Sequence, residues 1–276
     1  MQSTRKLLAG LALAVSAGLV QAAPEVRIYN WFDYITPQTL TQFKQDSGIK
    51  LTKTATRAQV LDNRLEGNLY GIDIHGAKDS LVKGNRIIGR QDRRMNERGN
   101  GIYVWNAPGA VVEGNDVRYG RDGIFTNTSR KNVFRNNTFR DLRFAVHYMY
   151  ADNSEVSGNV SIGNHLGYAV MFSTRVKVTG NVSLNDRDHG VMLNYANQGE
   201  FRGNYVKGAK GKCTFLYNAH KNDFSGNWFE GCGIGIHFTA GSQDNRILGN
   251  YPEIPRTIIL FRKHYKKFRV NKKALL

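Results

Sequence analysis

Residues 101–117 read GIYVWNAPGAVVEGNDV, and residues 123–139 read GIFTNTSRKNVFRNNTF. Both stretches begin with Gly-Ile, and both place an apolar residue two positions before a Gly-Asn or Asn-Asn pair. Between these landmarks the apolar and polar residues alternate in short runs, which is typical of β-strands. The second stretch repeats the first after 22 residues, and a repeat of fixed length is a strong indication of fold.

The same pair recurs along most of the chain. Its second residue is Asn68, Asn85, Asn115, Asn137, Asn159, Asn181, Asn204, Asn227 and Asn250. From Asn115 onward the steps are 22, 22, 22, 23, 23 and 23 residues. The apolar residues two positions before each pair are Leu65, Val82, Val112, Phe134, Val156, Val178, Phe201, Phe224 and Ile247. A second apolar column is predicted at Ile72, Ile102, Ile124, Val146, Val170, Val191 and Ile236.

The length of this unit selects the architecture. It is too short for a strand followed by a full-length helix, and it lacks the leucine spacing of a leucine-rich repeat. Short strands separated by Gly and Asn corners fit one turn of a parallel β-helix, because both residues accept the left-handed backbone conformation. Equivalent residues would stack about 4.8 Å apart. The sequence therefore predicts an all-β, right-handed parallel β-helix over residues 56–250.

One step is longer than all the others. Asn85 and Asn115 are 30 residues apart, and the excess falls in RQDRRMNERGN, residues 90–100. Insertions in a solenoid emerge as loops on one face. We expect either a partner-contact loop or a tolerated surface loop here.

Both ends of the chain depart from the repeat. Residues 1–23 combine Arg5 and Lys6 with an apolar run and a small-residue cleavage pattern, which predicts a cleaved secretory signal. Residues 24–55 predict a strand over 26–31, a helix over 36–48 and a strand over 49–51. Residues 251–276 form a basic tail. The formal net charge of +17 suits nucleic acid, anionic lipid or an acidic protein, and composition alone does not choose among them.

The two cysteines, Cys213 and Cys232, would lie in an oxidising compartment after export. Their spacing matches no zinc pattern. Either a disulfide or two separate thiols fits the sequence, and we favour separate thiols.

Two parts of the chain resemble known families. The run VRIYNWFDYITPQTLTQFKQDSGIKL, residues 26–51, resembles the mature N-terminus of periplasmic polyamine-binding proteins. The stretches LEGNLYGIDIHGAKDSLVKGN (65–85) and HLGYAVMFSTRVKVTGNVS (165–183), together with the two quoted first, resemble the NosD family. This second likeness covers about residues 56–250 and includes corner and outward positions as well as the core.

The NosD resemblance implies a function. In that family, the protein is a periplasmic β-helix that helps to assemble the copper-sulfur centre of nitrous oxide reductase. The implied partners are an ABC-type membrane complex, a copper chaperone and the reductase. The resemblance implies no enzymatic activity and no nucleic-acid partner, and the chain itself is not expected to span a membrane.

Outward positions of one sheet carry the candidate site. Counting one residue past the position of the second apolar column in every coil predicts an outward column of Asp73, Tyr103, Phe125, His147, Met171, Met192, Phe215 and His237. Two residues further lie His75, Trp105, Asn127, Met149, Ser173, Asn194, Tyr217 and Thr239. Thioether and imidazole groups suit Cu(I). We therefore predict a transient Cu(I) site at His147, Met149, Met171 and Met192. Packing of these side chains under a partner, without metal, is the alternative.

The aromatic members of these columns predict a partner surface. Large apolar side chains at outward positions usually mark a binding face. The predicted surface consists of Tyr103, Trp105, Phe125, Phe215, Tyr217 and His237.

A rival function rests on YGIDIHG, residues 70–76, which resembles a motif of alginate epimerases. Tyr70 is expected to face inward, while Asp73 and His75 share the outward face as an acid/base pair would require. The rival is therefore a β-helix epimerase or lyase that acts on an acidic polysaccharide.

Overall fold

The computed structural model describes residues 25–27, 50–52 and 56–253. The chain divides into two compact units, residues 1–54 and 55–276. In the first unit, β1 (Glu25–Arg27) and β2 (Lys50–Thr52) form a parallel pair. The predicted signal segment and the predicted helix over 36–48 lie outside the described residues.

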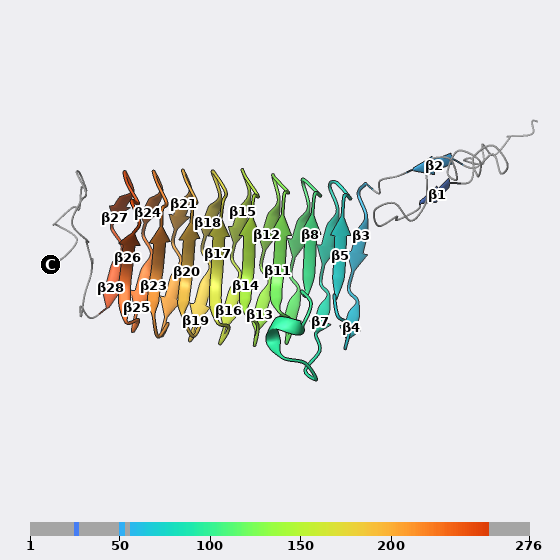
Figure 1. Ribbon diagram of the computed structural model, residues 1–276, viewed down its shortest axis with the longest axis horizontal. Coiled ribbons are helices and arrows are strands. Elements are labelled where there is room, and N and C mark those ends of the chain that lie inside the picture. Colours follow the sequence, from blue (N-terminus) through green and yellow to red (C-terminus); the bar gives the residue numbers. More distant parts are fainter. Residues whose placement is uncertain (1–24, 28–49, 53–55, 254–276) are drawn as a thin grey trace, which may run out of the picture. The chain divides into compact units, whose positions relative to one another are not determined.

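The second unit is a solenoid of three parallel sheets (Figure 1). The first sheet contains β3 (Gln59–Leu61), β6 (Leu81–Lys83), β9 (Val111–Glu113), β12 (Val133–Arg135), β15 (Glu155–Ser157), β18 (Lys177–Thr179), β21 (Glu200–Arg202), β24 (Asp223–Ser225) and β27 (Arg246–Leu248). The second contains β4 (Arg64–Glu66), β7 (Arg86–Ile88), β10 (Asp116–Arg118), β13 (Thr138–Arg140), β16 (Val160–Ile162), β19 (Val182–Leu184), β22 (Tyr205–Lys207), β25 (Trp228–Glu230) and β28 (Tyr251–Glu253). The third contains β5 (Ile72–His75), β8 (Ile102–Trp105), β11 (Asp122–Asn127), β14 (Phe144–Met149), β17 (Leu166–Met171), β20 (His189–Asn194), β23 (Lys212–Tyr217) and β26 (Ile234–Thr239).

Each complete coil contributes one strand to each sheet, so strands pair with their counterparts one coil away. The predicted all-β parallel β-helix is confirmed. The repeat also continues beyond the predicted boundary at Asn250, because β28 pairs with β25. The remainder of the predicted basic tail, residues 254–276, lies outside the described residues.

The core is built from stacked apolar rows. Successive members of the predicted inner row are direct Cα partners, and each is at most 1% exposed: Val82, Val112, Phe134, Val156, Val178, Phe201 and Phe224. Phe201 and Phe224 stack with ring centroids 4.6 Å apart. The prediction for these seven residues is confirmed.

A ladder of buried asparagines runs along one corner. The backbone N–H of each asparagine donates to Oδ1 of the next, at 2.9 to 3.0 Å, through Asn63, Asn85, Asn115, Asn137, Asn159, Asn181, Asn204, Asn227 and Asn250. Asn68, the first Asn of the recurring pair in the sequence, is not part of this ladder, because Asn63 occupies the first position. Val60 aligns with Val82, whereas Leu65 lies in the second sheet, opposite Ile87.

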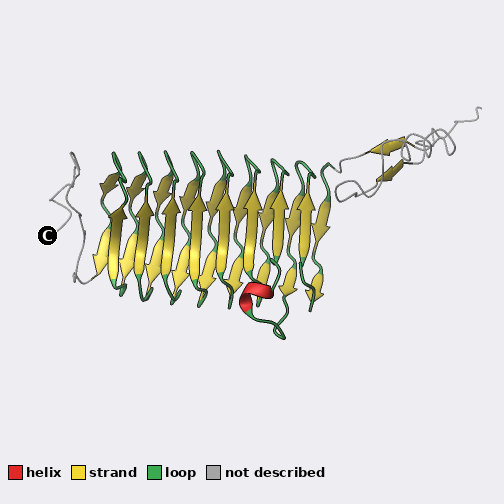
Figure 2. Cartoon of the chain, viewed as in Figure 1, coloured by secondary structure: helices red, strands yellow, loops and turns green. Residues whose placement is uncertain are grey.

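The predicted insertion emerges as a loop between β7 and β8 and carries the short 3-10 helix η1 (Met95–Glu97). This is the red element in Figure 2, where the rest of the described solenoid consists of strands and turns. Among the described residues, no helix has the length and apolar character needed to cross a membrane.

The cysteines form a disulfide. Cys213 in β23 is bonded to Cys232 in the segment between β25 and β26, so the favoured prediction of separate thiols was wrong. Residues on successive coils of a solenoid lie close together although they are distant in sequence. The 19-residue separation of the two cysteines therefore brings them together, which spacing alone does not reveal.

Candidate metal site

The outward face of the third sheet carries two rows of side chains. The first outward row is Asp73, Tyr103, Phe125, His147, Ala169, Met192, Phe215 and His237. The second outward row is His75, Trp105, Asn127, Met149, Met171, Asn194, Tyr217 and Thr239.

The predicted rows were wrong on one strand, β17. Ala169 occupies the place predicted for Met171, and Met171 occupies the place predicted for Ser173. The cause is Tyr168, which aligns with Val146 and points inward, only 1% exposed. Its hydroxyl donates to the carbonyls of Asn159 and Val182, at 2.8 and 2.9 Å. A tyrosine with carbonyl acceptors can occupy a core row, but a search for aliphatic residues passes over it.

The four predicted metal ligands nevertheless surround a single residue, Ala169. His147 precedes it and Met192 follows it in the first outward row. Met149 and Met171 are direct partners in the second outward row, and Met171 lies two residues beyond Ala169 on β17. Neighbouring positions are about 4.8 Å apart between coils and about 6.6 Å apart along a strand. The three thioethers are half-buried, while Ala169 is fully covered.

His147 is held in place from one side. Its Nδ1 lies 3.0 Å from Oδ2 of Asp122, and Arg143 binds the same carboxylate. The rings of Phe125 and Phe144 flank the imidazole, with centroids at 4.8 and 4.9 Å. His147 is 7% exposed, and its Nε2 is buried with no hydrogen-bond partner among the described residues. Sequence reasoning missed Asp122 and Arg143, because neither belongs to the two predicted columns.

The donor set of this cluster is soft. Within the described part of the chain, no group of three or more His, Cys, Asp or Glu side chains is placed to hold a metal ion. Metal binding at Ala169 would therefore depend on thioether sulfur together with one imidazole nitrogen. That combination favours Cu(I) over harder divalent ions.

The predicted aromatic surface falls into two runs. Tyr103 and Phe125 stack with centroids 5.2 Å apart, and Phe125 continues onto His147. Phe215 and His237 form a second contact at 5.4 Å. Trp105 and Tyr217 lie in the second outward row. The methionine cluster separates the two runs.

A third aromatic group was not predicted. Tyr150, Phe172 and Tyr195 are 53%, 38% and 43% exposed, and their rings stack with centroids 5.3 and 5.2 Å apart. All three have a left-handed backbone, with φ of 51°, 47° and 50°, which is rare for bulky residues. Each directly follows a member of the second outward row in sequence. Their recurrence at the repeat spacing was a signal that could have found them. We call these three residues the corner aromatic ladder.

The catalytic alternative is only partly supported by geometry. Asp73 and His75 share the outward face of β5, as predicted, and the ring of His75 contacts Trp105 at 3.8 Å. Burial raises the pKa of Asp73, and the nearby His75 opposes that rise. Tyr70 does not face inward, because it is 45% exposed and lies against Tyr103. No ion pair links Asp73 or His75 to a Lys or Arg of the described residues.

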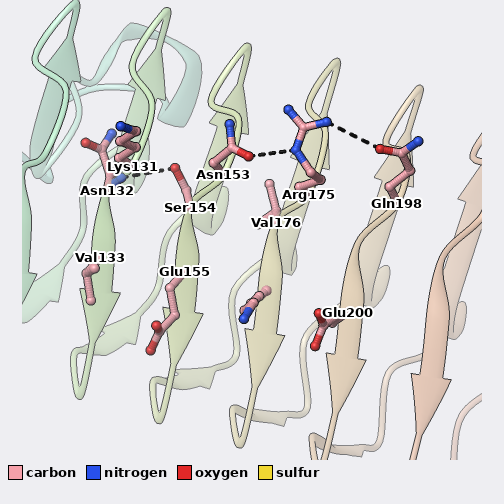
Figure 3. Close-up of a pocket in the computed structure, with 11 residues that line it drawn as sticks. Lys131, Asn132, Val133, Asn153, Ser154, Glu155, Arg175, Val176, Gln198 and Glu200 are labelled. Carbon is pink, nitrogen blue, oxygen red and sulfur yellow. Dashed lines mark hydrogen bonds between the residues drawn. The ribbon is translucent and has the colours of Figure 1, made fainter.

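A polar hollow of about 440 Å³ lies over the first sheet at β12, β15, β18 and β21 (Figure 3). Its rim consists of corner residues, where Arg175 Nε donates to Asn153 Oδ1 at 2.7 Å and Arg175 Nη1 reaches Gln198 Oε1 at 3.4 Å. Glu155 and Glu200, on β15 and β21, also line it. The hollow contains none of the predicted site residues.

Comparison with known proteins shows which proteins the solenoid resembles. Two curated relatives, both named probable ABC transporter binding protein NosD, come from Stutzerimonas stutzeri and Pseudomonas aeruginosa. They are 38% identical over 248 residues and 37% identical over 237 residues. The matches cover 85% and 81% of this chain but 56% and 54% of the relatives. The chain thus spans about half the length of the curated relatives it matches.

Other similarities are narrower. The putrescine-binding periplasmic protein PotF of Escherichia coli is 37% identical over 70 residues, which cover 25% of this chain and 19% of PotF. Among solved structures, DFA-IIIase from Arthrobacter chlorophenolicus A6 in complex with GF2 superposes with a TM-score of 0.57 at 17% identity, over 78% of this chain and 60% of that one. At that identity the likeness concerns the fold alone.

The family assignment rests on the solenoid itself. Residues 83–252 match the family described as periplasmic copper-binding protein (NosD). This range includes all four residues around Ala169 and most of both outward rows. The chain therefore belongs to the NosD family of periplasmic copper-binding proteins.

Proposed function

We propose that this chain is a periplasmic accessory protein that carries Cu(I) during assembly of the copper-sulfur centre of nitrous oxide reductase. The signal segment at residues 1–23 would direct export and would be cleaved from the mature protein. The observation that carries the proposal is the group of three methionines and one histidine around Ala169, on the outward face of a solenoid from a copper-binding family.

The chemistry of the cluster suits a carrier. Thioether sulfur binds Cu(I) without first losing a proton, and it is uncharged, so a copper ion can leave without a large electrostatic cost. His147 Nε2 would supply the one nitrogen ligand. Because Met149, Met171 and Met192 are half-buried, an incoming ligand from another protein can reach the ion from the solvent side. This arrangement favours transfer over storage.

The aromatic runs on either side of the cluster would receive the partners. We propose that an ABC-type membrane complex, a copper chaperone and the reductase contact this face in turn. The two curated relatives carry the name ABC transporter binding protein, which supports the first of these partners. The chain itself would catalyse no reaction.

The test is a Cu(I) competition titration of the full chain against a chromogenic chelator. The variant is Met171→Leu with Met192→Leu, because Leu keeps the volume nearly constant and leaves the fold intact. The control is Met95→Leu, which alters a methionine in η1, away from the cluster. We expect the double variant to bind at least about tenfold more weakly, because losing even a partner behind a ligand costs about 10- to 100-fold in metal affinity. The control should match the parent. Equal affinity of all three proteins would overturn the proposal.

The epimerase or lyase reading keeps one supporting observation, the raised pKa of Asp73 beside His75. A carboxyl with a raised pKa keeps its proton to a higher pH than a free carboxyl does, as a general acid requires. Incubation with alginate and pectate, followed by product analysis, separates the two functions. We expect no product. Product that disappears in His75→Ala would favour the enzyme instead.

A further inference from the structure

Asp122 is a buried carboxylate at the first residue of β11. Its side chain is 1% exposed. Arg143 donates from Nε to Oδ1 at 2.7 Å and from Nη2 to Oδ2 at 2.5 Å. Two parallel bonds of this kind fix the position of both oxygens. A guanidinium that donates to both oxygens is the charge-assisted partner of an ionised carboxylate. Asp122 is thus an ionised acceptor in a fixed place.

This acceptor determines the tautomer of His147. The distance from Nδ1 to Asp122 Oδ2 is 3.0 Å, and an ionised carboxylate can only accept, so Nδ1 carries the proton. Arg143 Nη2 is farther from Nδ1, at 3.4 Å, and its donors already serve the carboxylate. A proton on Nε2 would be a buried donor without an acceptor, because that atom has no partner among the described residues. The free lone pair therefore lies on Nε2.

The surroundings of His147 would hold it in place as a metal ligand before the metal ion binds. The rings of Phe125 and Phe144 flank the imidazole, which limits its rotation and excludes water. Ala169 is the next residue of the row, so no large side chain stands between His147 and Met192. The thioethers of the cluster begin immediately beyond this alanine.

We propose that Asp122, locked by Arg143, is a positioning residue that holds His147 in the tautomer whose Nε2 receives the metal ion. The inference rests on the proposed function, because it concerns the same cluster. A carboxylate behind a histidine ligand fixes the ring and strengthens its donor nitrogen, and removal of such a partner typically weakens metal binding about 10- to 100-fold.

The first test needs no metal. The full chain is labelled with ¹⁵N-histidine, and two-bond proton–nitrogen NMR spectra report which ring nitrogen carries the proton. His147→Gln identifies the signal among the seven histidines. We expect Nδ1–H in the parent. Asp122→Asn offers a single acceptor oxygen to the donors of both Arg143 and His147, so the Nδ1–H population should fall. The same tautomer in Asp122→Asn as in the parent would overturn the inference.

The matched control is Asp116→Asn. Asp116 accepts the same two-point contact from Arg118, at 3.1 and 2.9 Å, but lies in the second sheet. It should leave the His147 signal unchanged. If Asp122→Asn fails to fold, Arg143→Lys provides a second variant, since it keeps the charge but loses the two-point contact.

The second test uses Cu(I) competition and separates the two proposals. Asp122→Asn should weaken binding about tenfold in the parent but have no effect in the His147→Gln background. If His147→Gln alone leaves the affinity unchanged, the role of His147 in the proposed function fails. If His147→Gln weakens binding while Asp122→Asn does not, the positioning role fails and the metal site stands.

Discussion

Asn137 and Asn159, one coil apart, are joined by two hydrogen bonds to the same oxygen. The backbone N–H and the side-chain Nδ2 of Asn137 both donate to Oδ1 of Asn159, each at 2.9 Å. Asn159 in turn donates from Nδ2 to the carbonyl of Phe134 at 2.9 Å and to Asn181 at 3.0 Å. A single side chain thereby bonds to buried polar groups on the coil before it and on the coil after it.

Asn159→Ala should therefore destabilise the solenoid strongly. The substitution leaves the Asn137 N–H and the Phe134 carbonyl buried without these partners, at a cost of about 1 to 3 kcal/mol for each group. We expect a loss of about 3 kcal/mol or more, measured as a lowered midpoint of urea unfolding. Asn96→Ala, an exposed residue of η1, is the control. Similar midpoints for both variants would show that the ladder does not stabilise the fold.

Because of Asp186, we expect the free energy of unfolding to depend on pH. It is fully buried and accepts hydrogen bonds from Ser183 Oγ, Ser161 Oγ and the backbone N–H of Asn164, at 2.6, 2.7 and 2.8 Å. Burial raises its pKa to about 6, and these hydrogen bonds only partly offset that rise. The folded state therefore binds the proton more tightly than the unfolded state.

Tighter proton binding by Asp186 in the folded state contributes its full stabilisation below about pH 4. This contribution is lost as the pH rises through 6. The span corresponds to roughly 3 kcal/mol. Asp186→Asn, which stays neutral, should remove this dependence, so that its stability relative to the parent improves between pH 5 and pH 8. Urea unfolding at both pH values measures the change. Asp188→Asn, at an exposed position, should retain the slope, and a retained slope in Asp186→Asn would contradict the argument.

The fold could be predicted from the sequence because the repeat uses residue types that suit only a few structural positions. Only a small set of side chains fits a corner ladder or a stacked core row, so the spacing of Asn and of Ile, Val and Phe carries the architecture. The same logic explains the errors. Asn68 has the right local sequence but follows β4, a strand of the second sheet, and Asn63 has no preceding glycine. Local motifs do not show which sheet a strand joins.

The candidate site was predicted less completely than the fold, for two reasons. The row shift at β17 arose because Tyr168 occupies a core position that sequence assigns to aliphatic residues. The partners of His147 were missed because Asp122 and Arg143 reach it from a neighbouring coil and from the turn before β14. Contacts of that kind depend on side-chain direction at the end of a strand, which a period of 22 residues does not specify.

The disulfide offers a third prediction. Cys213 and Cys232 join successive coils across 19 residues of sequence, and closing a loop of about this length stabilises a protein by about 3 kcal/mol. Cys213→Ala with Cys232→Ser should lower the urea midpoint accordingly. Reductant should lower the midpoint of the parent to a similar value and leave the double variant unchanged. A parent that is insensitive to reductant, at a concentration shown to free both thiols, would exclude a stabilising role.

The last prediction concerns Phe172. Its left-handed backbone and its exposed ring are both unfavourable for a residue whose role is to stabilise the fold. A bulky residue with φ of 47° costs about 1 to 2 kcal/mol relative to the right-handed region, and a ring 38% exposed recovers little by burial. Stacking on Tyr150 and Tyr195 returns about 0.5 to 1.5 kcal/mol for each pair. The two effects nearly cancel. Phe172→Asn, which tolerates the left-handed conformation, should therefore change the free energy of unfolding by less than about 1 kcal/mol.

The same variant shows whether the corner aromatic ladder stabilises the fold or binds a partner protein. Phe172 directly follows Met171 of the methionine cluster in sequence. If the corner aromatic ladder receives a partner, Phe172→Asn should bind Cu(I) as the parent does but transfer it more slowly to purified apo nitrous oxide reductase. Tyr251→Asn, at an exposed aromatic of the second sheet, should transfer at the parental rate. A loss of stability well above 2 kcal/mol, with transfer unchanged, would instead make the ladder part of the scaffold.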